Sequence, residues 1–204
     1  MQDISDVGTI PRSEMSRDAR YDVYTDNHNL LYNLIIHQSF LITMPFRNFI
    51  TEDCICIDVS SRSKTAVLLK VSQLLCRRQP TLDLDTLFDA YWKRESLGST
   101  AIGHGILIPH IRSNATHTIT GCLIKLQNPV DFGAEDKQPV DLVVGLVAGV
   151  EQADEHLQVL AKITQQFSSA TFRRACRKAT TQNDLCKLFI QSHQYSPDLA
   201  AASI

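Results

Sequence analysis

Hydrophobic positions recur at helical spacing in two stretches of the first half of the chain. The first helix is expected between the serines at positions 60, 61 and 63, which offer an N-cap, and Pro80, which ends it. Its apolar positions are Val67, Leu68, Val71, Leu74 and Leu75. The second is expected to be capped by Asp83 and to run out near Arg94 or Glu95. Its apolar face contains Leu84, Leu87, Phe88 and Tyr91.

Short apolar runs in the middle of the chain predict strands. The segment 98–105 contains three glycines and reads as a loop that feeds a strand over 106–108, with His110 at its end. The next stretch, 118–126, is rich in β-forming residues, and Asn128-Pro129 is expected to mark a turn. The apolar run 140–147 is short enough for a buried strand.

Helical spacing returns in the last third of the chain. Asp154 and Glu155 suit a first turn, because carboxylates are stabilised near a helix N-terminus. The apolar positions that follow are Leu157, Leu160, Ala161, Ile163 and Phe167. Phe172 and Cys176 fit a short helix, and Thr181 with Asp184 resembles a capping box before a last one. Interleaved helices and strands predict the α/β class, a layered sandwich with helices over a sheet.

The first 44 residues differ in character from the rest, being polar and acidic up to an apolar run over 30–42. That run is thirteen residues long and contains polar side chains, whereas a membrane helix needs roughly 20 apolar residues. The acidic stretch before it also disfavours a cleaved signal peptide. We therefore expect a flexible N-terminal extension over 1–44, one domain over 45–192, a tail over 193–204, and no membrane insertion.

Composition and charge argue against nucleic acid as a binding partner and against a disulfide-linked protein. The chain has 204 residues, is 44% hydrophobic and carries a formal charge of -2, so no overall basic field draws nucleic acid. The densest basic cluster is Arg173, Arg174, Arg177 and Lys178, which we interpret as a solvated helix terminus. Among the six cysteines, Cys54 and Cys56 have strand spacing, and no C-x-x-C occurs. A reduced, cytoplasmic protein without disulfides is expected.

The segment Gly98-Ser99-Thr100-Ala101-Ile102-Gly103-His104-Gly105-Ile106-Leu107-Ile108-Pro109-His110 carries the candidate chemistry. Its glycines allow backbone N–H groups to approach an anion, its two hydroxyls can donate, and a histidine stands at a strand end. Neither nucleotide-binding glycine fingerprint is met. The spacing of His104, His110 and His117 matches no usual zinc site, so no metal is expected.

This segment resembles the hallmark of the fructose/mannitol-type IIA domain of the bacterial phosphotransferase system. The resemblance continues through 128–132, 138–142, 155–157 and 172–178, and so covers roughly residues 46–190. It implies a mixed β-sheet flanked by helices. It also implies that the histidine after Ile-Pro, here His110, accepts a phosphoryl group from the histidine-containing phosphocarrier protein. The protein would then be a phosphohistidine carrier that needs no cofactor, rather than an enzyme that turns over a small substrate.

The resemblance assigns further site residues, each with an alternative that stays open. A second family histidine matches His156, which would orient His110 or the phosphate, or else be structural. A recurring arginine matches Arg94, which would stabilise phosphoryl charge or else cap its helix. Ser99, Thr100 and the backbone around Gly103 and Gly105 are expected to bind phosphoryl oxygens.

The sequence departs from the family pattern at three places. Ile111 follows the acceptor where glycine is common, His104 stands where asparagine is frequent, and 149–154 lacks an expected proline. The free-standing nitrogen-regulatory branch, which acts on partner proteins, fits best, because no fused IIB or membrane part is present. The alternatives are a sugar-transport carrier that donates to a separate IIB component, and a binding module without phosphoryl transfer.

Overall fold

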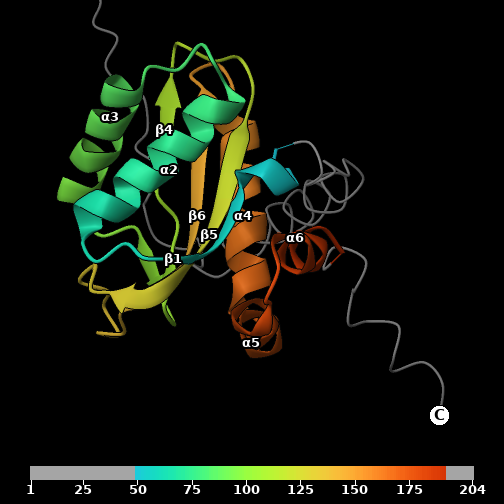
Figure 1. The fold of residues 1–204 in the computed structure, drawn as a ribbon. Helices are drawn as coiled ribbons and strands as arrows, with labels where there is room; N and C mark the ends of the chain where they lie inside the picture. The colour runs from blue at the N-terminus through green and yellow to red at the C-terminus, as the bar shows by residue number, and fades with distance from the viewer. Residues whose placement is uncertain (1–48, 192–204) are drawn as a thin grey trace, which may run out of the picture. The chain divides into compact units, whose positions relative to one another are not determined.

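The computed structural model describes residues 49–191, so the expectations for 1–44 and 193–204 lie outside the described residues. Within them, six strands form one mixed sheet in the order β1-β5-β6-β3-β2, with β4 also paired to β6 (Figure 1). The strands are β1 (Ile55–Val59), β2 (Ala101–Gly103), β3 (Ile106–Leu107), β4 (His110–Ser113), β5 (Thr120–Val130) and β6 (Val140–Gly149). The pairs β1–β5, β3–β6 and β4–β6 are parallel, and β2–β3 and β5–β6 are antiparallel. The predicted α/β class with a mixed sheet is confirmed.

Helices cover both faces of this sheet. They are α2 (Lys64–Arg78), α3 (Leu84–Ser96), α4 (Ala153–Ser168), α5 (Ala170–Lys178) and α6 (Gln182–Gln191), with a short 3-10 helix η2 (Glu52–Cys54) before β1. Figure 1 shows α2 and α3 on one face and α4 to α6 on the other. The predicted N-caps are present, since Ser63 accepts from the Ala66 N–H at 3.1 Å and Asp83 from the Thr86 N–H at 2.9 Å.

The two faces of the sheet build two hydrophobic clusters, because successive side chains of a strand point to opposite sides. Along β6, Leu142, Val144 and Leu146 face the cluster under α4 to α6. Val143 and Val147 face the cluster under α2 and α3. A strand buried on both faces needs apolar residues at every position, which is why the run 140–147 is almost continuously hydrophobic.

The sequence interpretation was wrong about the segment Asn128-Pro129. These two residues lie inside β5 rather than in a turn. The pairing with β6 shifts register between Lys125 and Val130, and both residues are exposed. An irregularity of this kind tolerates a proline, because no ladder hydrogen bond depends on its missing N–H.

Smaller differences concern the ends of elements. Cys54 lies in η2 rather than in the strand, but it still faces the same core as Cys56. The glycine-rich loop contains the short strand β2, and His110 begins β4 instead of ending the preceding strand. All six cysteines are free, as expected.

The basic cluster of α5 is only in part the solvated terminus that the sequence suggested: Arg174 and Lys178 are exposed, whereas Arg173 and Arg177 are engaged by neighbouring groups. Arg173 is buried and donates to the Phe167 and Ser168 carbonyls, which closes the end of α4. Arg177 forms a bidentate pair with Asp141, with nitrogen–oxygen distances of 2.6 and 2.7 Å. Charge at these two positions therefore binds the helix to its neighbours.

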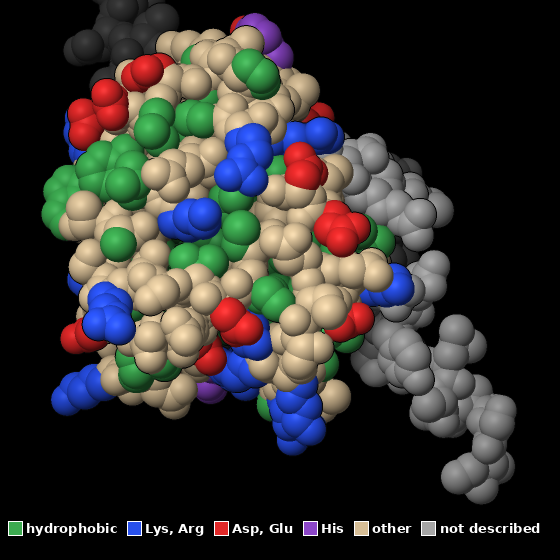
Figure 2. All heavy atoms as spheres, in the orientation of Figure 1, with side chains coloured by type: hydrophobic (Ala, Val, Ile, Leu, Met, Phe, Trp, Pro, Cys, Tyr) green, Lys and Arg blue, Asp and Glu red, His purple; other side chains and the backbone are tan. Residues whose placement is uncertain are grey.

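The surface in the view of Figure 2 mixes both signs of charge, and hydrophobic side chains gather over α3 at its left edge. On α3, Trp92 is 44% exposed and stacks on Phe88 with ring centroids 6.4 Å apart. Within residues 49–191, no helix has the length and apolar character needed to span a bilayer.

Candidate functional site

His110 stands at the first position of β4, directly after Pro109. Its Nδ1 lies 2.8 Å from the Ile108 carbonyl oxygen. Because a carbonyl only accepts hydrogen bonds, Nδ1 carries the proton and Nε2 keeps its lone pair. Burial lowers the pKa of His110 below its usual value, and the charge of Arg94 adds to this, while the Ile108 hydrogen bond and Glu95 oppose it. At neutral pH the ring is therefore a neutral nucleophile with one free nitrogen.

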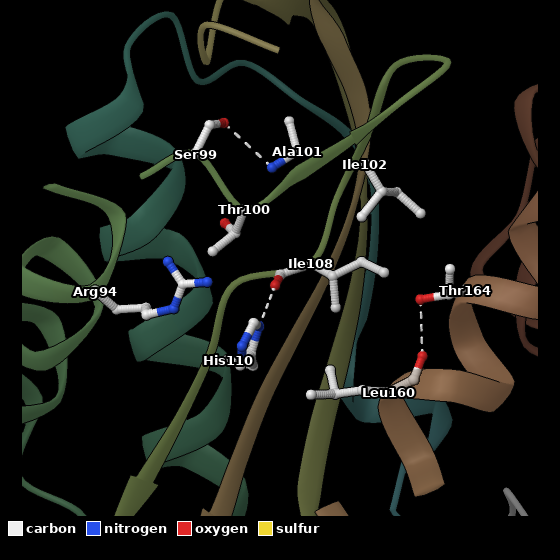
Figure 3. A pocket seen from close by; sticks show the side chains of 9 residues that line it. All are labelled: Arg94, Ser99, Thr100, Ala101, Ile102, Ile108, His110, Leu160 and Thr164. Atoms are coloured by element: carbon white, nitrogen blue, oxygen red, sulfur yellow. Dashed lines mark hydrogen bonds between the residues drawn. The ribbon is translucent and has the colours of Figure 1, made fainter. Parts of the chain in front are cut away.

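A hollow of about 200 Å³ opens beside this ring (Figure 3). Arg94, Ser99, Thr100, His110 and Thr164 supply its polar side chains. The remaining wall is apolar, formed by Ala101, Ile102, Ile108 and Leu160. Three of the predicted site residues thus meet His110 in one hollow: Arg94 comes from α3, and Ser99 and Thr100 come from the segment just before β2.

Arg94 extends from the last turn of α3 toward His110 (Figure 3). Its Nη1 also donates to the Gly98 carbonyl at 3.0 Å, just beyond the end of the helix. Arg94 therefore caps the end of α3 and also lies close to His110, so the two roles expected for it do not exclude each other. A guanidinium has five N–H donors, so one bond to Gly98 leaves others free for an anion.

Thr100 is buried, and both of its donors go to one carboxylate. Its backbone N–H and its hydroxyl donate to Glu95 Oε2, at 2.9 and 2.6 Å. A hydroxyl has a single proton, so Thr100 in this arrangement has no donor left for a phosphoryl oxygen. Ser99 is exposed and its hydroxyl oxygen accepts from the Ala101 N–H, which leaves its own proton available to donate.

His156 lies outside the hollow but against the acceptor ring. It is in the first turns of α4, is 5% exposed, and packs edge-on to His110 with centroids 5.7 Å apart. Burial lowers its pKa to about 4, with His110 and Arg112 contributing. Among the described residues its buried Nε2 has no hydrogen-bond partner. A neutral imidazole with an unpaired nitrogen beside His110 is suited to bind or orient an added group.

Gly103 and Gly105 do not line the hollow. They form the turn between β2 and β3, which is secured by other residues. The His104 N–H donates to Asp136, and Arg177 donates to the His104 carbonyl at 2.6 Å. In this arrangement the glycines shape the turn.

The departures from the family pattern are accommodated locally. His104 has a φ of 55°, a region that asparagine and histidine enter more readily than most residues. Ile111 lies in β4 and packs against the core beneath α2 and α3. In place of a proline before α4, Gln152 takes the N-cap position, and its side chain bridges the Gly149 N–H and Glu155.

Two further residues near the acceptor were not singled out as site residues from the sequence. Glu95 contacts Thr100, and Arg112 influences His156 through its charge. Arg112 lies two positions beyond His110 in β4, and strand alternation alone could have placed both on one face. The contact of Glu95 with Thr100 depends on how α3 ends, which hydrophobic periodicity does not specify.

Comparison with known proteins shows which family the chain resembles over most of its length. Residues 48–192 match the family model described as "Phosphoenolpyruvate-dependent sugar phosphotransferase system, EIIA 2". A nitrogen regulatory protein of Pseudomonas aeruginosa is 35% identical over 134 residues, which are 66% of this chain and 87% of that protein. One of Escherichia coli strain K12 is 31% identical over 159 residues, 78% of this chain and 96% of that protein.

A solved structure shows the same fold at comparable identity. The crystal structure of the nitrogen regulatory protein IIA-Ntr from Neisseria meningitidis superposes with a TM-score of 0.65 at 30% identity. The match covers 68% of this chain and 94% of that one. The described sheet and its helices therefore have a counterpart in a similar protein.

Proposed function

Because the chain belongs to the EIIA 2 family of the phosphoenolpyruvate-dependent sugar phosphotransferase system, we propose that it accepts a phosphoryl group on His110 Nε2. The donor is the phosphohistidine of a histidine-containing phosphocarrier protein. The phosphorylation state of His110 then controls binding to partner proteins.

The observation that carries this proposal is the hydrogen bond from His110 Nδ1–H to the Ile108 carbonyl, which leaves Nε2 as the free nitrogen. In the transfer, the Nε2 lone pair forms a P–N bond while the P–N bond of the donor breaks, and the donor leaves as imidazole. The acceptor ring becomes more positive, and the Ile108 carbonyl stabilises that charge. As the group moves, Arg94 neutralises charge on the phosphoryl oxygens and the Ser99 hydroxyl donates a hydrogen bond to them, a role supported by the position of both residues in the wall of the hollow.

The regulatory role is favoured over sugar transport by the relatives, since those of P. aeruginosa and E. coli are both named nitrogen regulatory proteins. Sugar transport is the alternative, because the matched family is described as a sugar phosphotransferase system. In that case His110 would pass its phosphoryl group on to a separate IIB protein.

The test is phosphorylation with phosphoenolpyruvate, the first enzyme of the system and the phosphocarrier, followed by intact-mass analysis. We expect one phosphoryl group that is stable in base and lost in acid, and none in His110→Ala. Arg94→Lys should slow transfer on the order of 10²-fold, because a point charge replaces a fork-shaped donor. His156→Ala should react more slowly but measurably, because an orienting group is not the nucleophile.

Two outcomes would contradict the proposal. Acid-labile phosphate recovered from His110→Ala and mapped to His156 or His104 would mean that the acceptor is misassigned. Absence of any label on wild-type protein would favour the third reading, a binding module without transfer. Onward transfer from labelled protein to a IIB protein would support transport over regulation.

A further inference from the structure

A continuous set of hydrogen bonds runs from a buried carboxylate to the acceptor imidazole. Glu95 Oε2 accepts from both the N–H and the hydroxyl of Thr100. The Thr100 carbonyl accepts from the Ile108 N–H at 3.0 Å. The Ile108 carbonyl accepts from His110 Nδ1–H. Each of these groups is fixed by the one before it, so Glu95 is linked to the tautomer of His110 through two intermediate residues.

Stability alone does not account for Glu95. The side chain is 9% exposed, and within residues 49–191 its second oxygen, Oε1, is buried without a hydrogen-bond partner. Burying a carboxylate with one oxygen unpaired costs free energy, whereas an apolar side chain of similar size would fill the same space. A buried carboxylate with one unpaired oxygen therefore points to a role beyond packing.

The position of Glu95 along α3 supports such a role. It follows Arg94 directly and lies one residue before the end of the helix. By holding Thr100, it fixes the path of the chain from the end of α3 into β2, past Gly98, whose carbonyl accepts from Arg94. One carboxylate thus ties together the helix that carries the guanidinium and the segment that leads to the acceptor.

We propose that Glu95 is a positioning residue for the acceptor: through Thr100 and Ile108 it holds the His110 ring with Nδ1 protonated and Nε2 free toward the hollow. This inference rests on the proposed function of His110. The tautomer of His110 is nevertheless a property of the unphosphorylated protein, so it is measurable whether or not transfer occurs.

The experiment compares Thr100→Val and Glu95→Gln with matched changes at the other end of the same helix. Asp83 accepts from the N–H and the hydroxyl of Thr86, which repeats the carboxylate–threonine arrangement away from the acceptor. Thr86→Val and Asp83→Asn are therefore the controls. Thr100→Ser, which keeps the hydroxyl, is the conservative rescue.

Two quantities are measured on protein labelled with ¹⁵N-histidine: the tautomer of His110 by long-range ¹H–¹⁵N spectra, and the rate of phosphorylation by the phosphocarrier. The His110 signals are assigned from their loss in His110→Ala. We expect wild type, Thr100→Ser and both controls to hold a proton on Nδ1. Thr100→Val and Glu95→Gln should show a mixture of tautomers and transfer slowed on the order of tenfold or more, because small displacements of reacting groups are costly.

The result that overturns the proposal is an unchanged tautomer in folded Thr100→Val, whatever the transfer rate, or a changed tautomer with an unchanged rate. If Glu95→Gln fails to fold, Thr100→Val decides, because it removes only the hydroxyl donor. If wild-type protein is not phosphorylated at all, the proposed function fails. In that case an unchanged tautomer in Thr100→Val overturns the positioning role as well, whereas a changed one supports it.

Discussion

His156 shows at the scale of one residue how burial and function are balanced. Its ring is almost fully buried and its Nε2 is unpaired among the described residues. Burial, with the charges of His110 and Arg112, lowers its pKa to about 4. A charged ring without a partner in this buried place would destabilise the fold, so the ring has to stay neutral. The stability of the protein therefore depends on pH.

The sign of this dependence follows from the direction of the pKa shift. An unfolded histidine titrates near pH 6.5, so between about pH 6.5 and 4 the unfolded chain binds a proton on His156 that the folded protein rejects. Stability is therefore lost as the pH falls through this window, and His110, whose pKa is also lowered, acts in the same direction. We expect His156 to account for a loss of about 1.5 kcal/mol between pH 6.5 and 5.

Urea denaturation of wild type and His156→Gln at both pH values checks this expectation. The variant should lose less stability on acidification than wild type, by about that amount. His117→Gln is the control, because His117 is exposed in the turn before β5. An equal loss in wild type and His156→Gln would show that His156 does not titrate as its environment indicates.

Residue roles differ in how far the sequence could predict them. His110, Arg94 and Ser99 line one hollow. The sequence offered all three as site residues, because Ser99 and His110 belong to the glycine-rich segment and Arg94 lies just before it. The donors of Thr100 were expected to serve the phosphoryl group, but they are engaged by Glu95. That contact depends on the direction of the Glu95 side chain at the end of α3, which hydrophobic periodicity in the sequence does not predict.

At the scale of elements, the turn between β2 and β3 depends on a pair of charged side chains from elsewhere in the chain. Gly105 has a φ of +77°, and a Cβ there would lie 2.7 Å from both Arg177 Nη2 and Asp141 Oδ1. Any side chain at this position would displace the bidentate pair that connects α5 to β6 and to the His104 carbonyl. The turn, the helix and the strand are therefore coupled at one glycine.

Gly105→Ala should destabilise the protein by about 2 kcal/mol or more, because backbone strain and the displaced ion pair add together. Gly133→Ala is the matched control: its φ of +68° gives similar strain, but the nearest side-chain atom, Lys64 Nζ, is 3.9 Å from the added Cβ. Chemical denaturation of the two variants separates strain from crowding. Equal losses would mean that the Arg177–Asp141 pair adjusts freely and does not fix the turn.

Helices were easier to predict than strands in this chain. The N-caps Ser63 and Asp83 and the apolar faces that follow them are local signals, and the observed α2 and α3 begin where those signals place them. Strand ends depend on partners far away in sequence. The strand β5 continues through Asn128-Pro129 because Val130 pairs with Val140 of β6, a contact that local turn propensity cannot anticipate.

At the scale of the whole molecule, the site depends on both layers of helices. Arg94 and Glu95 come from α3 on one face of the sheet, and His156 and Leu160 come from α4 on the other. His110 is placed between them because β4 pairs with the central strand β6, with His110 opposite Leu146. The hydroxyl of Tyr91 in α3 donates to the Leu146 carbonyl at 2.6 Å, which ties that helix to the strand at the level of the acceptor.

The last prediction concerns residues 45–192, which we expect to fold and act without the remainder of the chain. The described residues between Ile50 and Phe189 supply two hydrophobic clusters, one on each face of the sheet, and the family match covers 48–192. A fragment of this size with its own core is of ordinary domain length. Expressed alone, it should unfold in a single transition, within about 1 kcal/mol of the full chain. It should also be phosphorylated on His110 at the same rate.

The full-length protein is the control. Insolubility of the fragment, or a loss of several kcal/mol in its free energy of unfolding, would mean that the boundary near residue 44 is wrong. In that case the apolar run 30–42 contributes to the folded domain.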